Sequence, residues 1–314
     1  MKEAYKNVLI TGGAGNLGRH VCQELKEQGY QCSLFDQTSP AEQRTPWQPE
    51  RGTMFIKGQL TNLADCMRAI TLSRATCIIH LAALPFTSDQ QPGKQWMPQM
   101  FPEDTTMQSN VMGTYYLMDA ARRLGVKKVI FASSYYTLGL GFRISDKPYV
   151  VEYLPIDEDH PQRPEDTYSL SKLMGEEILK AYARAYDIKC YALRLMGVSY
   201  PYHPYELGVS IADKKAPDHR GGPNGTTGQY ADARDIAYAI GLMIEKDLDV
   251  EFDVFNISTD NVYKESPKEY VANLLPDLVE LAKDMGPEDE LITCQKLKDT
   301  FGYKPKYTWR NRDN

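Results

Sequence analysis

The sequence predicts an α/β protein built on a doubly wound parallel sheet, followed by a smaller C-terminal lobe. Short apolar strands alternate with amphipathic helices over residues 1–197, and a glycine-rich turn follows the first strand. Strands that are apolar almost throughout are typical of a parallel sheet covered by helices on both faces. We therefore expect a domain over 1–197 with 232–257 packing back onto it, and a lobe over 198–314.

A glycine-rich turn follows the first predicted strand, Val8–Thr11, and leads into a helix predicted from Asn16 to Gln28. Gly12 would allow a sharp turn, Gly15 a close approach of the backbone to a pyrophosphate, and Gly18 close packing of helix and strand. The N-terminus of the helix would add N–H donors and a positive dipole. This pattern predicts a dinucleotide site, and a glycine turn without a ligand is the alternative.

The second predicted strand, Gln31–Asp36, ends in a carboxylate at the spacing expected of a group that binds a ribose. Asp36 would accept hydrogen bonds from both hydroxyls of the adenosine ribose and would repel the 2′-phosphate of NADP. Gln37 and Thr38 supply no arginine next to it, and Arg44 reads as a solvated loop residue. The sequence therefore predicts NAD as the cofactor.

The other elements alternate in the same way along the chain. We expect strands at 54–56, 76–80, 128–132 and 189–195, and helices at 62–73, 104–124 and 167–186. Beyond Gly197 turn-forming residues accumulate, and a helix at 232–245 and a strand at 253–257 follow, with further helices at 266–285 and 294–301.

Composition limits the kinds of partner. The 314 residues carry 36 basic and 42 acidic side chains, a net charge of −6, without a dense Lys/Arg run. We therefore expect a small-molecule partner, and neither nucleic acid nor an anionic membrane. Without an apolar span or a signal-like start, the sequence suggests a cytoplasmic protein. Six scattered cysteines, with no CxxC pair, read as reduced core thiols and suggest no metal site.

Five polar residues are candidates for chemistry. Tyr168 and Lys172 are one helical turn apart, so the ammonium would favour the phenolate and help Tyr168 act as a general base. Ser133 and Ser134 follow a strand at its carboxyl end, where a hydroxyl could hold a substrate oxygen. Asn110, a poor helix former, suggests a polar role such as holding a water. A surface Tyr/Lys pair, capping serines and a solvent-facing asparagine are the alternatives.

Together these motifs resemble the extended short-chain dehydrogenase/reductase family, and more narrowly its sugar epimerase/dehydratase branch. The resemblance covers about Val8 to Arg194 and extends more weakly to residues 230–237 and 301–305. Its motifs are Thr11-Gly12-x-x-Gly15-x-x-Gly18, Asp36, His80-Leu81-Ala82-Ala83, Asn110, Ser133-Ser134, Tyr168-x-x-x-Lys172 and Leu193-Arg194.

The resemblance implies an NAD-binding Rossmann domain and a substrate-binding lobe. By it, Tyr168 is the catalytic acid/base, Lys172 binds the nicotinamide ribose and tunes Tyr168, Ser134 orients the reacting oxygen, and Asn110 supports a relay water. The implied NAD contacts are Gly12, Gly15, Asn16, Leu17, Gly18, Asp36, Gln59, Leu60, Leu81, Ala82, Ala83, Tyr168 and Lys172. A homodimer is also implied, formed by two helices that carry Met107, Val111, Tyr115 and Met118, and Leu173, Ile178 and Tyr182.

The sequence departs from the family pattern at three places. Gln59 replaces an acid that meets the adenine, and Tyr135-Tyr136-Thr137 replaces the Asp-Glu of dehydratases, which disfavours 4,6-dehydration. Gly197 stands near the place where UDP-sugar epimerases have an asparagine, which weakens the case for a nucleotide-sugar substrate. The run 133–139 is locally similar to uronate-dehydrogenase-like members.

The sequence as a whole predicts an NAD-dependent oxidoreductase that takes a hydride from a hydroxyl carbon of a sugar or sugar acid. A sugar epimerase with a transient keto intermediate is the alternative. A non-catalytic cofactor sensor is a third hypothesis, because fold alone does not guarantee activity. The long loops at 84–103 and 142–166 are either covers over the substrate or surface additions.

Overall fold

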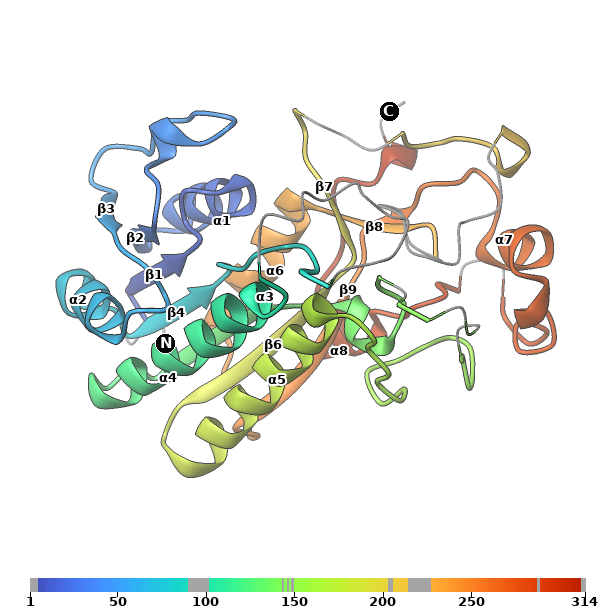
Figure 1. Cartoon of the computed structure of the whole chain (residues 1–314). Coiled ribbons are helices and arrows are strands. Elements are labelled where there is room, and N and C mark those ends of the chain that lie inside the picture. The colour runs from blue at the N-terminus through green and yellow to red at the C-terminus, as the bar shows by residue number, and fades with distance from the viewer. Residues whose placement is uncertain are drawn as a thin grey trace.

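The computed structural model describes residues 5–89, 102–142, 144–145, 147, 150–202, 206–213, 227–286 and 289–311. Within these residues, seven parallel strands form one sheet in the order β3-β2-β1-β4-β5-β6-β9 (Figure 1). They are β1 Asn7–Thr11, β2 Gln31–Asp36, β3 Met54–Lys57, β4 Cys77–His80, β5 Lys128–Ser134, β6 Lys189–Leu195 and β9 Phe252–Ile257. The strand order reverses direction between β1 and β4, which confirms the doubly wound sheet, and β9 pairs with β6 at its edge.

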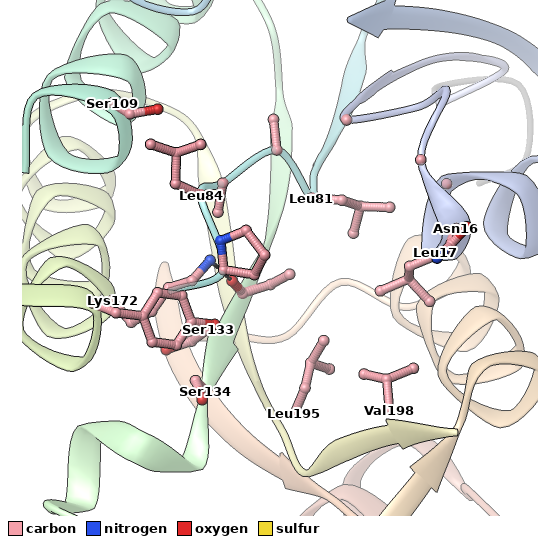
Figure 2. A pocket seen from close by; sticks show the side chains of 18 of the residues that line it. Asn16, Leu17, Leu81, Leu84, Ser109, Ser133, Ser134, Lys172, Leu195 and Val198 are labelled. Carbon is pink, nitrogen blue, oxygen red and sulfur yellow. Dashed lines mark hydrogen bonds between the residues drawn. The ribbon is translucent and has the colours of Figure 1, made fainter. Parts of the chain in front are cut away.

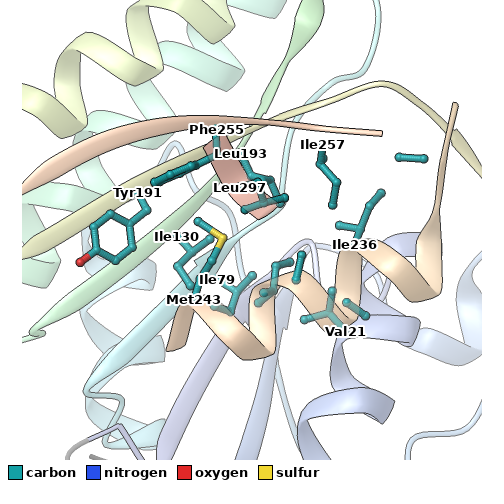
Figure 3. Close-up of a cluster of buried hydrophobic side chains, with 14 of the residues drawn as sticks. Val21, Ile79, Ile130, Tyr191, Leu193, Ile236, Met243, Phe255, Ile257 and Leu297 are labelled. Atoms are coloured by element: carbon teal, nitrogen blue, oxygen red, sulfur yellow. The ribbon is translucent and has the colours of Figure 1, made fainter. Parts of the chain in front are cut away.

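Helices cover both faces of this sheet (Figure 1). One face carries α1 (Asn16–Glu27), α6 (Ala233–Glu245) and α8 (Gln295–Phe301), and the other carries α2 (Leu63–Ser73), α4 (Gly113–Arg123) and α5 (Thr167–Ala185). Alternate strand residues supply the two apolar clusters beneath them: Ile79 packs toward α1 and α6, and Ile78 toward α2 and α4. Figure 3 shows the first cluster, where Val21, Ile236 and Met243 meet the strands.

Side-chain caps fix where several helices begin. The Asn62 side chain accepts from the N–H groups of Ala64 and Asp65 and starts α2. The Asp166 carboxylate accepts from the Ser169 N–H and starts α5. Such a cap contributes about 1 kcal/mol to helix stability. The cap at Asp166 places Tyr168 in the first turn of α5.

The segment predicted as one helix over 104–124 contains a change of helical type. Short α3 (Thr105–Met107) passes into a π-helical turn, η2 (Gln108–Met112), before α4 begins. The extra residue of a π turn displaces the chain locally, and such turns are frequent at functional sites. Here the turn carries the buried Asn110.

The C-terminal lobe differs most from expectation. A second small sheet, in the order β10-β8-β7, comprises β7 Gly197–Ser199, β8 Gln229–Asp232 and β10 Asp260–Asn261, none of them predicted. The helix expected over 266–285 is wrong: α7 (Pro267–Leu274) ends before Pro276, and the short 3₁₀ helix η5 (Pro276–Leu278) follows. Proline disfavours helical backbone at the residue before it, and Leu275 has φ −131°.

No helix of the described residues has the length and apolar character that a membrane span requires. All six cysteines lie buried within the fold.

A buried ion pair ties α5 to the sheet. Arg194 of β6 donates from Nε to Glu176 Oε1 (3.0 Å) and from Nη2 to Oε2 (2.9 Å), and each side chain is 3% exposed. Ser133 of β5 donates to the same Oε1 (2.5 Å). Because both charges are removed from water, neither partner can be lost without leaving the other uncompensated.

Glu176→Ala is therefore expected to lower the free energy of unfolding by about 3–5 kcal/mol, measured by urea denaturation. The control is its neighbour Glu177, which pairs with Lys180 at 3.5 Å and is 56% exposed. Glu177→Ala should cost about 0.5 kcal/mol or less. Equal losses in the two variants would contradict the role given to the buried pair.

Candidate active site

The carboxyl ends of the central strands meet at a cavity of about 630 Å³. In an open parallel sheet, ligands bind at this edge where the strand order reverses. Figure 2 shows Asn16 and Leu17 on one side of the cavity, Ser134 and Lys172 on the other, and Leu81 and Leu84 between them. The volume is within the usual range for sites that bind small molecules and cofactors.

The glycine turn after β1 presses against the segment that follows β4. Gly12 has φ +64°, and a Cβ on it would lie 2.7 Å from Ala82 N. A Cβ on Gly18 would lie 2.6 Å from the carbonyl oxygens of Gly12 and Gly13. Gly15 is the N-cap of α1, and no side chain caps this helix end. The turn therefore leaves backbone N–H groups at the helix N-terminus for an anionic ligand, as a pyrophosphate requires.

Asp36 ends β2 at the same edge and lines the cavity. Its Oδ1 accepts from the Gln37 N–H (2.8 Å), and its Oδ2 accepts from the Ala14 N–H (3.2 Å). Burial raises the pKa of this carboxyl, while backbone hydrogen bonds oppose the rise. Arg44 is exposed and is not among the residues that line the cavity. A fixed carboxylate without an adjacent lining arginine fits the diol of NAD better than the 2′-phosphate of NADP.

A directional chain of hydrogen bonds joins the two sides of the site through His80. Thr114 Oγ1 donates to the Asn110 carbonyl (2.6 Å), so it accepts from His80 Nε2 (3.0 Å). His80 Nδ1 then accepts from Thr11 Oγ1 (2.7 Å), which in turn accepts from the Ala82 N–H (3.3 Å). Burial lowers the pKa of His80 to about 3 and keeps the ring neutral in this pattern.

The polar side chains expected to act in catalysis share one wall of the cavity. Ser134 closes β5, and its side chain lowers the pKa of Tyr168. Lys172, one turn further along α5, donates from Nζ to the Ala132 carbonyl (2.7 Å). All three line the cavity. A hydroxyl and a phenol on one wall of a cavity can hold one substrate oxygen between them.

Burial determines the protonation of this pair. It raises the pKa of Tyr168 above its ordinary value, and the charge of a Tyr136 phenolate raises it further, while the Ser134 side chain lowers it. Burial also lowers the pKa of Lys172 to about 7, against the opposing effect of Glu176. The expected lowering of the Tyr168 pKa by Lys172 is therefore wrong for the protein alone, because desolvation disfavours both charged forms.

Most of the predicted site residues meet at the cavity. Those that line it are Gly12, Gly15, Asn16, Leu17, Gly18, Asp36, Gln59, Leu60, Leu81, Ala82, Ala83, Ser134, Tyr168 and Lys172. Asn110 is not among them. Its amide accepts from the Leu84 N–H (2.8 Å) and donates to the Leu84 carbonyl (3.1 Å) and to Ser171 Oγ (3.0 Å). The relay water at Asn110 remains a prediction.

The sequence reasoning missed several residues that line the cavity. They include Leu84, Ser109, Tyr136, Phe142, Leu195, Met196, Val198 and Tyr200. Leu195 and Met196 end β6 at the carboxyl edge, so the rule that identified Ser134 could also have found them. Of the loops expected to cover the substrate, 90–101 lies outside the described residues.

Fold and site together define an NAD-dependent short-chain dehydrogenase/reductase with a Rossmann sheet, and NAD is its cofactor. The model of the NAD dependent epimerase/dehydratase family matches residues 8–258, and the chain belongs to this family. The local similarity to uronate-dehydrogenase-like members remains a prediction.

Curated relatives agree with this assignment, and a solved structure has the same fold. The UDP-glucose 4-epimerase of Corynebacterium glutamicum is 24% identical over 96% of this chain and 91% of its own length. That of Erwinia amylovora is 30% identical over 69% of this chain and 58% of its own. Several other curated relatives align over only about half of their own length. A short-chain dehydrogenase/reductase superfamily protein from Agrobacterium tumefaciens with bound NAD has the same fold, with a TM-score of 0.66, 21% identity, and coverage of 96% of this chain and 93% of that one.

The low pKa of Lys172 makes the stability of the fold depend on pH. Below pH 7 the folded chain holds the charged form of Lys172 away from water. In the unfolded chain the same ammonium is hydrated, and its pKa is near 10.5. Each pKa unit of difference is worth about 1.4 kcal/mol, so this cost is largest below pH 7 and fades as the pH rises toward 10.5.

Lys172→Met is therefore expected to raise the free energy of unfolding at pH 7 by about 1–3 kcal/mol and to abolish activity. This figure allows for the loss of the hydrogen bond to the Ala132 carbonyl. The gain, measured as the difference in melting temperature from the wild type, should shrink between pH 7 and pH 10. Lys180→Met, at an exposed position of α5, serves as the control and should show no such trend. A Lys172→Met variant that is less stable at pH 7 would contradict the cost assigned to the buried cation.

Proposed function

We propose that the protein catalyses NAD-dependent oxidation of a hydroxyl carbon of a sugar or sugar acid. The observation that supports this is the pair of Ser134 and Tyr168, which lines the cavity with Lys172 and shares it with Asp36 and the glycine turn. A small-molecule substrate, a cytoplasmic location and substrate binding by the lobe over 198–314, all expected from the sequence, complete the proposal.

In the proposed reaction the substrate oxygen accepts a hydrogen bond from Ser134 and gives its proton to the Tyr168 phenolate. The carbon–oxygen single bond becomes a carbonyl as the carbon loses a hydride. The chemistry that NAD supplies when bound is acceptance of this hydride. Lys172 in its charged form stabilises the phenolate, and its anchor on the Ala132 carbonyl keeps the ammonium beside the reacting group.

A sugar epimerase is the second candidate. It is favoured by the relative from Corynebacterium glutamicum, named UDP-glucose 4-epimerase, which aligns with 96% of this chain. The same step at Tyr168 would run forward and then in reverse, with the keto-sugar accepting hydride on its other face. The two candidates differ in whether reduced cofactor leaves the protein.

Incubation of the protein and NAD with free sugars, sugar acids and UDP-sugars distinguishes the candidates. We expect reduced nicotinamide to accumulate with a free sugar or sugar acid, followed by absorbance. Tyr168→Phe should lower kcat by about 10²–10⁴-fold while NAD still binds in calorimetry. An isomerised sugar without net reduction of NAD would support the epimerase instead, and full activity of Tyr168→Phe would contradict both.

We further propose that the protein is a homodimer formed through α4 and α5. The two helices lie side by side at the outside of the fold (Figure 1). Tyr115 on α4 is 44% exposed, and Leu170 and Met174 on α5 are 38% and 40% exposed. Met118, assigned to this face from the sequence, is instead fully buried in the core. Large apolar side chains gathered on paired helices are typical of a surface that a second copy covers.

Met174→Glu is expected to convert the dimer to monomer in analytical ultracentrifugation, because a carboxylate cannot be buried unpaired. Leu72→Glu introduces the same charge at a 51% exposed residue of α2 and should leave the dimer intact. A wild-type protein that sediments as a monomer would rule out the proposed assembly.

A further inference from the structure

Tyr136 places a second phenol in the cavity beside Tyr168. It lies on the 3₁₀ helix η3 (Tyr135–Leu138) that follows β5, and its N–H donates to Ser134 Oγ (3.2 Å). The rings of Tyr136 and Tyr168 meet edge to face, with centroids 6.1 Å apart and planes at 89°. Both side chains line the cavity. The wall of the proposed reaction site therefore includes a second phenol, that of Tyr136. The proposed proton transfer uses only the phenol of Tyr168.

Packing fixes the ring of Tyr136 in place. The ring of Tyr135 lies 4.6 Å from it and that of Phe142 lies 5.5 Å away, both edge to face. Gly141 provides the space, since a Cβ there would come within 2.8 Å of Tyr136 Cγ. Because its neighbours already immobilise the side chain, binding a ligand through its hydroxyl costs little conformational entropy.

The electrostatics support a close approach of the two phenols. After burial, Tyr136 is the largest influence that raises the pKa of Tyr168. The proposed function already assigns the reacting oxygen to Ser134 and Tyr168. A phenol fixed next to them is therefore placed to meet a different oxygen of the same substrate.

We propose that the Tyr136 hydroxyl hydrogen-bonds the hydroxyl group on the carbon adjacent to the one that is oxidised. The site would then select a vicinal diol, the unit that a sugar ring presents, over a compound with a single alcohol. This inference rests on the proposed function, which places the reacting oxygen at Ser134 and Tyr168. It assigns Tyr136 to substrate selection and leaves proton transfer to Tyr168.

Tyr136→Phe tests the assignment because it keeps the packed ring and removes only the hydroxyl. The probes are two pairs that differ by the adjacent hydroxyl: D-glucuronate with 2-deoxy-D-glucuronate, and UDP-glucose with UDP-3-deoxyglucose. We expect the wild type to prefer the intact member of the pair it uses by about tenfold or more in kcat/KM. Tyr136→Phe should lose this preference, with a fall of about tenfold on the intact sugar and no change on the deoxy sugar.

Tyr186→Phe, which removes a hydroxyl from a 43% exposed tyrosine after α5, is the control and should keep the wild-type preference. If Tyr136→Phe keeps the preference, the assignment is overturned while the proposed function stands. An equal loss on both sugars with a lower melting temperature would mean that the hydroxyl is structural, which also overturns it. A wild type inactive on every free sugar, sugar acid and UDP-sugar tested would overturn the assignment together with the proposed function.

Discussion

The close approach of the glycine turn to the end of β4 is the constraint on which the rest of the site depends. Only glycine at position 12 leaves room for the backbone of Ala82, and only glycine at 18 lets α1 begin against the turn. Parallel pairing brings the carboxyl ends of β1 and β4 to one edge, and the N-terminus of α1 lines the cavity there. The His80 chain then joins the turn, through Thr11, to the π-helical segment at Asn110. The glycine turn, where NAD would bind, and the π-helical segment on the opposite side of the cavity are thus joined by one chain of hydrogen bonds.

Burial gives the opposite side of the cavity its chemical character at a cost in stability. Tyr168 and Lys172 both lie where their charged forms are disfavoured, and the Glu176–Arg194 pair beneath them is almost inaccessible to water. A site that places ionisable groups in this way gives up stability for function. The same desolvation strengthens each hydrogen bond that the substrate oxygen would make there.

Features that depend on local spacing could be predicted from the sequence. The glycine turn, Asp36 and the Tyr168/Lys172 pair each follow from short-range patterns, and the structure brings all of them to one cavity. The second small sheet could not be foreseen, because β10 has two residues and β7 has three, too few to show a periodicity. Pro276 did carry a signal that the helix after Ser266 would stop early.

The pKa values of buried side chains were harder to predict from the sequence than the spacing of the motifs. Sequence places a lysine one turn from a tyrosine, but it does not show how deeply both are buried, and burial reverses the expected shift of the Tyr168 pKa. Asn110 illustrates the same limit, since its position in the chain indicated a polar role but could not reveal Leu84 as its partner.

A crystal structure of the protein with NAD and the oxidised sugar tests the central claim most directly. The account predicts the adenosine ribose hydroxyls on Asp36, and the carbonyl oxygen of the sugar within hydrogen-bonding distance of both Ser134 Oγ and the Tyr168 phenol. A complex in which the sugar oxygen contacts neither group, or in which the nicotinamide lies away from Tyr168, would contradict it.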